Sequence, residues 1–241
     1  MKFKTILAMC LAATTVLATS SAMAWESEDG AHSVTANVLL GSDYVFRGIS
    51  QTSRKPTIQG GIDYEHGTGL YVGTWASNVD FGSETDATEA KSEFNLYGGF
   101  SSEIGGTGVG YDIGALRYYY PGLGGSDDFN ELYGSLSYRY FSIGIAHSGN
   151  FLNSGEKATY YNVGFEYGLP YDITLMAHAG YQNLDSTLGD SYKDYLVGVS
   201  KAIFDLEVSL TWTDTDSEGE NFAGDKDLVD NIVTFSVSKT F

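Results

Sequence analysis

Apolar and polar residues alternate along most of this chain. In the first stretch Val34, Val38 and Leu40 share one parity, while Thr35 and Asn37 share the other. Successive side chains of a β-strand point to opposite faces, so this pattern predicts strands with one apolar and one polar face. About twelve strands are predicted, near residues 33–47, 58–65, 70–79, 93–100, 109–114, 131–139, 141–148, 161–167, 172–182, 192–200, 206–213 and 233–238.

The connections between the predicted strands are alternately long and short. The long ones lie at about 47–56, 80–91, 121–128, 149–157, 183–191 and 214–228, and the short ones at 66–69, 102–107, 140–142, 168–171 and 201–204. Bacterial transmembrane barrels have an even number of strands, short periplasmic turns and longer extracellular loops. The sequence therefore predicts an all-β fold, a transmembrane up-and-down antiparallel β-barrel with both termini in the periplasm.

Aromatic residues on the apolar face favour a membrane barrel over a soluble sandwich, whose strands also alternate. In membrane barrels they form belts at the two interfaces, whereas a sandwich buries its largest aromatics mid-strand. The outward face is therefore predicted to contact outer-membrane lipid. We expect Phe46, Phe94, Tyr181, Tyr195 and Trp212 at the long-loop ends, and Tyr64, Phe100, Phe141, Tyr167 and Phe241 at the short-turn ends.

The first 24 residues have the pattern of a secretory signal peptide. Lys2 and Lys4 precede an apolar run at 6–17, and Ala22 and Ala24 form a small-x-small cleavage pattern. The run is too short to cross about 30 Å of hydrocarbon as a helix. We predict a cleaved signal peptide at 1–24 and a single β-barrel domain at 25–241, located in the outer membrane of a Gram-negative cell.

The predicted mature chain is strongly acidic. Without Lys2 and Lys4, 11 basic residues remain against 31 acidic ones, a net charge of −20. Nucleic-acid binding needs a basic surface, so we expect no nucleic-acid partner. The single cysteine, Cys10, lies in the predicted signal peptide, which leaves the mature chain without disulfides or thiolate metal sites. We predict no cofactor.

The longest predicted loop, 214–228, concentrates acidic residues such as Asp214, Asp216, Asp225 and Asp227. Calcium takes oxygen ligands, so a calcium site is one interpretation of this cluster. The spacing fits no EF-hand loop, and a solvated external loop is the simpler interpretation. We therefore predict no metal site.

The last strand ends on Phe241, preceded at alternate positions by Val233, Phe235 and Val237. This pattern resembles the recognition signal of the outer-membrane barrel assembly machinery, which makes that machinery an expected partner. Lys239 departs from the pattern, but a lysine near an interface can extend its ammonium group into water.

One stretch resembles a known family. Residues 42–51 read SDYVFRGISQ, Pro56 and QGGIDY at 59–64 follow, and GLYVGTWASN at 69–78 and YYYPG at 118–122 continue the similarity. These runs resemble the TorF family of porins, also called the Gcw_chp family. The match is dense over 37–79 and thin afterwards. The resemblance implies a proteobacterial outer-membrane barrel and no particular substrate.

The polar parity supplies the predicted lining of the lumen, which is mostly acidic. Such a lining concentrates cations and repels anions, so we predict a narrow, mildly cation-preferring channel for passive diffusion of small solutes. The alternative is a lumen filled by its own side chains. Arg47 and Arg139 would then pair with Glu93 or Glu131 and form a plug. The predicted lining residues are Arg47, Asp63, Glu65, Glu93, Asp112, Glu131, Arg139, Glu166, Asp172, Asp194 and Glu207.

Two further functions are weaker alternatives. A lipid-hydrolysing barrel needs a serine and a histidine within hydrogen-bond reach, and the best pair is His147 with Ser148. Neighbours on a strand face opposite ways, which counts against this pair, so we predict no enzyme and no catalytic residue. His178 is expected to face the lumen. The loops, of about ten residues, are long enough to bind small ligands but not to form a separate binding domain.

Overall fold

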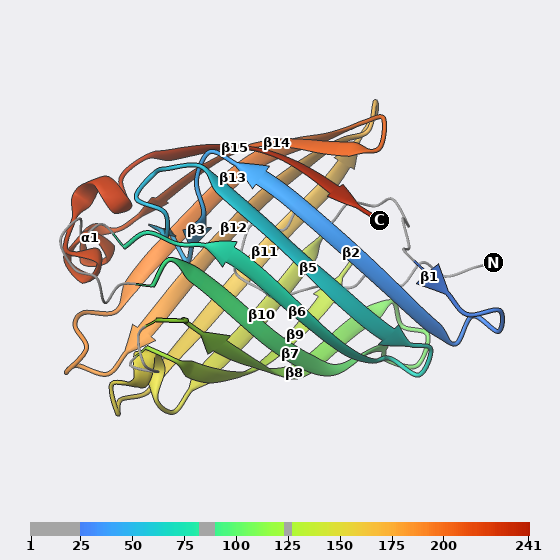
Figure 1. Ribbon diagram of the computed structural model, residues 1–241, viewed down its shortest axis with the longest axis horizontal. Helices are drawn as coiled ribbons and strands as arrows, with labels where there is room; N and C mark the ends of the chain where they lie inside the picture. The colour runs from blue at the N-terminus through green and yellow to red at the C-terminus, as the bar shows by residue number, and fades with distance from the viewer. Residues whose placement is uncertain (1–24, 82–89, 123–126) are drawn as a thin grey trace.

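A closed β-barrel forms the body of the protein (Figure 1). The computed structural model describes residues 25–81, 90–122 and 127–241. The predicted signal peptide, with Cys10, lies outside these ranges. The twelve long strands are β2 His32–Gly41, β5 Thr57–His66, β6 Leu70–Asn78, β7 Ser92–Glu103, β8 Val109–Tyr119, β9 Phe129–Tyr138, β10 Phe141–Ser148, β11 Ala158–Leu169, β12 Ile173–Leu184, β13 Tyr192–Ile203, β14 Leu206–Thr215 and β15 Ile232–Thr240.

Each long strand pairs antiparallel with its two neighbours, so the prediction of an antiparallel barrel of about twelve strands is confirmed. The ring closes where β2 pairs with β5 on one side and with β15 on the other. Closure extends to the last residue, because the Phe241 amide donates to the Ala36 carbonyl at 2.7 Å. No strand edge of the ring is left open, which removes the site where sheets aggregate.

The remaining elements are short. β1, Trp25–Glu26, pairs with β2, and the hairpin strands β3, Val45–Phe46, and β4, Ile49–Ser50, pair with each other. The long connections contain the 3₁₀ helices η1, Phe151–Asn153, and η2, Lys226–Leu228, and the helix α1, Ser217–Ala223. Among the described ranges, no helix has the length and apolar character needed to cross a membrane.

The predicted alternation of long and short connections is confirmed. Short turns occupy 67–69, 104–108, 139–140, 170–172 and 204–205, and long connections occupy 42–56, 79–91, 120–128, 149–157, 185–191 and 216–231. In Figure 1 the long connections, with α1, lie at one end of the barrel, while β1 and the C-terminus lie at the other. Two distinct ends follow from this: a loop end and a short-turn end.

The outward face is apolar, as the alternation predicts. Leu96 and Leu132, for example, point away from the barrel and are 60% and 67% exposed. The expected aromatics other than Phe46 lie outward near the strand ends, among them Phe94 and Tyr195 toward the loops and Phe141 toward the short turns. A soluble protein rarely exposes a continuous apolar surface of this extent, whereas a barrel in lipid requires one.

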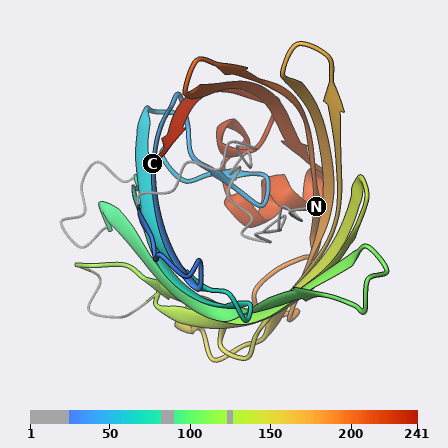
Figure 2. The ribbon, with the colours of Figure 1, turned by 90° about the vertical axis from the view of Figure 1, so that its right-hand side faces the viewer.

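The first predicted strand is wrong beyond residue 41. β2 ends at Gly41, and the chain then turns into the barrel, where Figure 2 shows the segment of β3 and β4 crossing the interior of the ring. Tyr44 is buried at 2% exposure, and Phe46 packs on Tyr118 inside, so neither belongs to the outward face or to the aromatic belt. The apolar–polar pattern of the sequence continues past residue 41 because successive side chains of a short hairpin strand also point to opposite faces, as they do in a strand of the barrel wall.

Large aromatic side chains fill the loop half of the interior. Inward residues of several strands, such as Trp75, Tyr118 and Tyr160, form one buried cluster with Tyr44 of the hairpin segment. Rings contact rings, as where Tyr118 stacks on Phe129 with centroids 4.2 Å apart. The predicted list of lining residues contained only charged side chains, so it did not include these aromatic residues.

Arginine in place of an outward leucine tests whether this face lies in hydrocarbon. Leu96 lies in the body of β7, and Leu70 begins β6 at the short-turn end. We expect Leu96→Arg to lower the free energy of unfolding by about 2–4 kcal/mol and Leu70→Arg by about 0–1 kcal/mol, because the penalty depends on depth in the bilayer. Urea unfolding of the protein folded in phospholipid vesicles measures both, and equal losses would contradict a hydrocarbon-facing band.

Candidate functional site in the barrel lumen

A two-residue turn carries Arg47 into the interior of the barrel. β3 and β4 pair as Val45 with Ser50 and Phe46 with Ile49, which leaves Arg47 and Gly48 as the turn. Both have positive φ, 47° and 84°, as the tight turns that suit hairpin twist require. A left-handed backbone is unfavourable for arginine, and such strain persists only where the surroundings hold it. The tip is therefore held in place by its contacts.

Hydrogen bonds at its base anchor this hairpin. The Asp43 carboxylate accepts from the hydroxyls of Ser50 and Thr52, both at 2.7 Å, and the Gln51 amide donates to the Tyr44 carbonyl at 2.6 Å. Burial raises the pKa of Asp43, and the two hydroxyl donors oppose that shift. The first and last residues of the inward segment are thus joined before the chain enters β5.

Both terminal nitrogens of the Arg47 guanidinium have hydrogen-bond partners in the lumen, while its Nε is buried without one among the described residues. The guanidinium lies 2.8 Å from both carboxylate oxygens of Glu131 on β9, and it donates to Gln182 on β12 at 2.9 Å. It also lies over the ring of Tyr160, 4.3 Å from the centroid. Burial opposes the charge on Arg47, but the carboxylate of Glu131 more than compensates, so the pKa of Arg47 is raised.

This ion pair crosses the barrel. The hairpin enters from the β2 side of the wall, and Glu131 and Gln182 belong to strands far from β2 around the ring. The Arg47 and Glu131 side chains are 2% and 4% exposed. Of the pairings considered for a plug, that of Arg47 with Glu131 is present. Glu93 instead accepts from Asn95 at 2.8 Å.

Inward tyrosines hold most of the buried carboxylates against the wall. In each case the phenol donates to the acid, which satisfies a carboxylate that would otherwise be buried without a partner. A carboxylate with a phenol donor remains an acceptor facing the lumen, but its motion is restricted. Pairs of this kind are Tyr44 with Glu93 (3.3 Å), Tyr71 with Asp112 (2.7 Å), Tyr97 with Asp63, Tyr118 with Glu131 (3.1 Å) and Tyr160 with Asp194 (2.9 Å).

Most of the predicted lining residues have the inward parity of their strands. Glu65, Glu166 and Glu207 lie toward the short-turn end, where they are exposed or half-buried, and the others lie deeper. Arg47 is also inside, although it comes from the hairpin and not from the wall. The predicted acids with inward parity are Asp63, Glu65, Glu93, Asp112, Glu131, Glu166, Asp194 and Glu207.

Two predicted lining residues lie elsewhere. Arg139 belongs to the turn 139–140 and Asp172 to the turn 170–172, and both are exposed. Their φ values, 56° and 57°, are left-handed, so the chain has already left the strand at these positions. The alternating pattern does not show where a strand ends. Parity alone therefore led to the prediction that both residues face the lumen. Arg139 lies over the ring of Tyr138 and not against an inward acid.

The candidate hydrolytic pair is separated by the barrel wall. His147 is exposed on the outward face, with Nδ1 2.8 Å from the Thr159 hydroxyl, whereas Ser148 is 1% exposed on the inward face. His178 faces the lumen, as expected, and its Nε2 lies 2.7 Å from the Tyr160 hydroxyl and 3.3 Å from Asp194. His147 and Ser148 therefore do not form a nucleophile and base.

The acidic loop near the C-terminus uses its carboxylates for local structure. Asp216 caps α1 and accepts from the Gly219 amide at 3.3 Å, and Asp225 caps η2 and accepts from the Asp227 amide at 2.9 Å. Within the described ranges, no three histidine, cysteine or acidic side chains are grouped as a metal site would require.

The sequence profile of one family, described as bacterial protein of unknown function (Gcw_chp), matches residues 26–241. No curated protein matches the sequence at a significant level. Solved porins share the fold. The NanC porin superposes with a TM-score of 0.57 at 9% identity, and the KdgM porin with 0.53 at 8%; each alignment covers 86% of this chain and 98% of the porin. A KdgM porin in complex with disordered oligogalacturonate gives 0.51 at 7%, over 86% and 97%.

Removing the acid of the buried ion pair should destabilise the barrel. Glu131→Gln leaves Arg47 buried without a counter-charge, and we expect a loss of about 3 kcal/mol in the free energy of unfolding. Glu166→Gln makes the same change at an exposed inward position and should change stability by less than about 0.5 kcal/mol. Urea titration of the folded protein in vesicles compares the two. Equal effects would show that the Arg47 pair contributes no more than a surface charge.

Proposed function

This chain belongs to the Gcw_chp family of bacterial proteins of unknown function, and we propose that its barrel is an outer-membrane channel for passive diffusion of small solutes. The observation that carries the proposal is the closed ring of twelve strands with an apolar outward face and an acidic inward face. The fold shared with the NanC and KdgM porins supports it. Closed barrels span membranes because all their backbone groups are paired within the ring.

The proposed location and assembly follow from the same architecture. The predicted signal peptide would carry the chain across the inner membrane, and the barrel assembly machinery would then insert it through the C-terminal strand. Phe241 suits that role, because its backbone bonds to Ala36 at the seam where the ring closes. TorF membership and a proteobacterial source remain part of this proposal.

The charges of the lumen favour cations. In the described strands, inward carboxylates outnumber inward basic groups, and the charge of Arg47 is balanced by Glu131. An acidic passage raises the local concentration of cations and repels anions. The KdgM porin has been solved in complex with oligogalacturonate, a chain of sugar acids. The lining of this barrel would repel such a chain, so we propose neutral or cationic solutes.

A closed barrel that serves as structure, or that binds a small ligand, is the second candidate. The specific observation in its favour is the Arg47–Glu131 pair, which joins the hairpin to the far wall among packed aromatic rings. We propose that the hairpin narrows the channel and does not seal it. The half-buried and exposed acids at the short-turn end, Glu65, Glu166 and Glu207, would then line the wider part of the passage.

An enzymatic role has less support. The most plausible serine and histidine are on opposite faces of the wall, and the inward His178 faces the tyrosine hydroxyl of Tyr160 and the carboxylate of Asp194, not a serine. The porin-like fold is in keeping with a channel.

Planar bilayer recording tests the channel. We expect discrete current steps in potassium chloride. Across a salt gradient, the reversal potential should have the sign of a cation-selective channel, because the proposed lumen is acidic. Absence of steps in any salt would favour the closed barrel. Steps with anion preference would keep the channel and overturn the proposed selectivity.

Two arginine variants test the constriction. Arg47→Ala removes the side chain that crosses the lumen and leaves Glu131 unpaired, so conductance should rise by roughly twofold and cation preference should increase. Arg139→Ala makes the same change of charge in an exposed turn and should leave both unchanged. If the two variants conduct alike, Arg47 does not limit the current.

A further inference from the structure

Two histidines lie side by side at the short-turn end of the barrel. His32 begins β2 and His66 ends β5, and the register of these strands pairs the two residues directly. The Gly67 amide donates to the Ala31 carbonyl at 2.7 Å, so the adjacent pair is hydrogen-bonded and His32–His66 is a non-hydrogen-bonded pair. Side chains approach each other most closely at such pairs. The two ring centroids are accordingly 4.9 Å apart.

Both histidines lie on the outward face, at the rim of the barrel. They have the same parity as Leu40 on β2 and Ile62 on β5, which are 58% and 56% exposed, and they are themselves half-buried. Tyr64, an aromatic residue of the predicted interfacial belt, precedes His66 by two positions. The pair therefore lies one row beyond that belt, toward the short turns and the water (Figure 1).

Hydroxyl groups hold the Nδ1 atom of each ring. His32 Nδ1 lies 2.7 Å from the Tyr64 hydroxyl, and His66 Nδ1 lies 2.8 Å from the Thr68 hydroxyl. The Thr68 amide also approaches His66 Nδ1, at a longer distance of 3.3 Å. Within the described ranges neither Nε2 atom has a hydrogen-bond partner. Each ring is thus oriented through one nitrogen, and its other nitrogen is available.

Two oriented imidazoles with available Nε2 atoms can bind a divalent transition metal. Zinc binds imidazole nitrogen at about 2.0–2.1 Å, and two imidazoles on one tetrahedral ion have ring centroids about 5 Å apart. The spacing of His32 and His66 matches that value. A ligating histidine donates its other ring N–H to an outer group, which fixes the ring. With the metal on Nε2 the proton is on Nδ1, where the hydroxyl oxygens of Tyr64 and Thr68 accept it.

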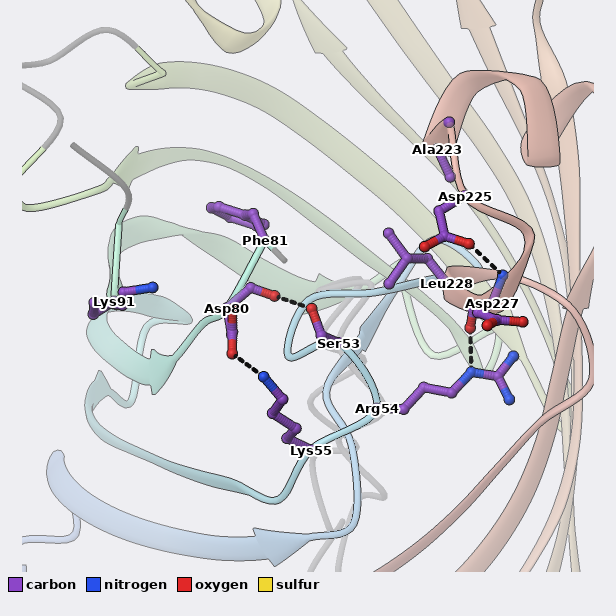
Figure 3. Close-up of a pocket in the computed structure, with 11 residues that line it drawn as sticks. Ser53, Arg54, Lys55, Asp80, Phe81, Lys91, Ala223, Asp225, Asp227 and Leu228 are labelled. Atoms are coloured by element: carbon purple, nitrogen blue, oxygen red, sulfur yellow. Dashed lines mark hydrogen bonds and ion pairs between the residues drawn. The ribbon is translucent and has the colours of Figure 1, made fainter. Parts of the chain in front are cut away.

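Acidic side chains are the other ligands that this chain offers to a cation. Figure 3 shows an example at the loop end, where Asp225 and Asp227 line a cavity. Carboxylate oxygens suit Mg²⁺ and Ca²⁺, whereas imidazole suits Zn²⁺ and Cu²⁺. Excess Mg²⁺ therefore occupies oxygen sites without competing for the two histidines.

We propose that His32 and His66 bind one divalent transition-metal ion, Zn²⁺ or Cu²⁺, at the short-turn rim of the barrel. Structural zinc sites have four protein ligands and catalytic sites three, and the described ranges group no such set of side chains. This site has two, so water or an external ligand completes the coordination and the ion is exchangeable. The ion links β2 to β5. Its binding does not depend on conduction through the channel proposed above.

Copper is a probe whose spectrum reports its nitrogen ligands. The full barrel without an affinity tag, folded in lipid nanodiscs, is titrated with Cu²⁺ in the presence of excess Mg²⁺. We expect saturation at one ion per chain. Pulsed EPR of the bound Cu²⁺ should show the remote nitrogens of two imidazoles, because each ring binds through Nε2. A spectrum with one imidazole or none overturns the proposal, and this measurement needs no variant to fold.

Single substitutions identify the two ligands. His32→Gln and His66→Gln should each weaken Cu²⁺ binding by at least about tenfold, because loss of an outer-shell partner alone costs about 10–100-fold. His147→Gln is the matched control and should leave binding unchanged. His147 is also outward, with Nδ1 2.8 Å from the Thr159 hydroxyl, but its cross-strand neighbours are Thr159 and Leu132. Equal binding by all three variants would show that the ion does not bind at the pair.

Zinc tests whether the ion links the two strands. The folded barrel brings the histidines together and the unfolded chain does not, so Zn²⁺ should raise the urea midpoint of the unaltered protein. His147→Gln should show the same rise, and His66→Gln little or none. A rise of equal size in His66→Gln and in the unaltered protein would mean that zinc stabilises the barrel elsewhere, and it would overturn the site.

Discussion

Closure of the strand ring is the constraint on which the rest of the structure depends. β2 pairs with both β5 and β15, and the backbone of Phe241 continues that pairing to the end of the chain. A ring without edges leaves no row of unpaired backbone groups, which is the condition for a sheet to be surrounded by apolar material. Once the ring is closed, every second side chain of a wall strand must point inward, so parity decides which wall residues face the lumen.

The interior shows how a barrel of this size accommodates many acids. Burying a carboxylate is costly unless a donor meets it, and here phenol groups from inward tyrosines supply the donors, as Tyr71 does for Asp112 and Tyr160 for Asp194. The one inward arginine comes from a hairpin and not from the wall. It pairs with Glu131 across the lumen, and other inward carboxylates, such as Glu65 and Glu207, lie nearer the short-turn end.

The loop end of the barrel is held together by side-chain contacts and not by strand pairing. Its segments are joined by contacts between residues distant in sequence, such as Arg54 with the carbonyls of Asp227 and Asp230 and Lys55 with Asp80. The inward hairpin and residues 53–55 at the loop end belong to one stretch of chain, 42–56. This stretch leaves the barrel wall after Gly41 and returns to it at Thr57. Narrowing of the lumen and the shape of its entrance therefore depend on the same segment.

The sequence by itself determined the strands, their outward faces and the order of long and short connections, because a period of two residues and turn chemistry are local properties. For the same reason, parity predicts that Glu131 and Asp194 point inward, and both are buried on the inward face of their strands. Only the tertiary structure decided that 42–50 leaves the wall, that Arg139 and Asp172 sit in turns, and that Arg47 meets Glu131. The apolar–polar alternation is the same in a wall strand and in an inward hairpin, so it cannot distinguish them. The contact between Arg47 and Glu131 joins residues 84 positions apart, and no local sequence pattern predicts it.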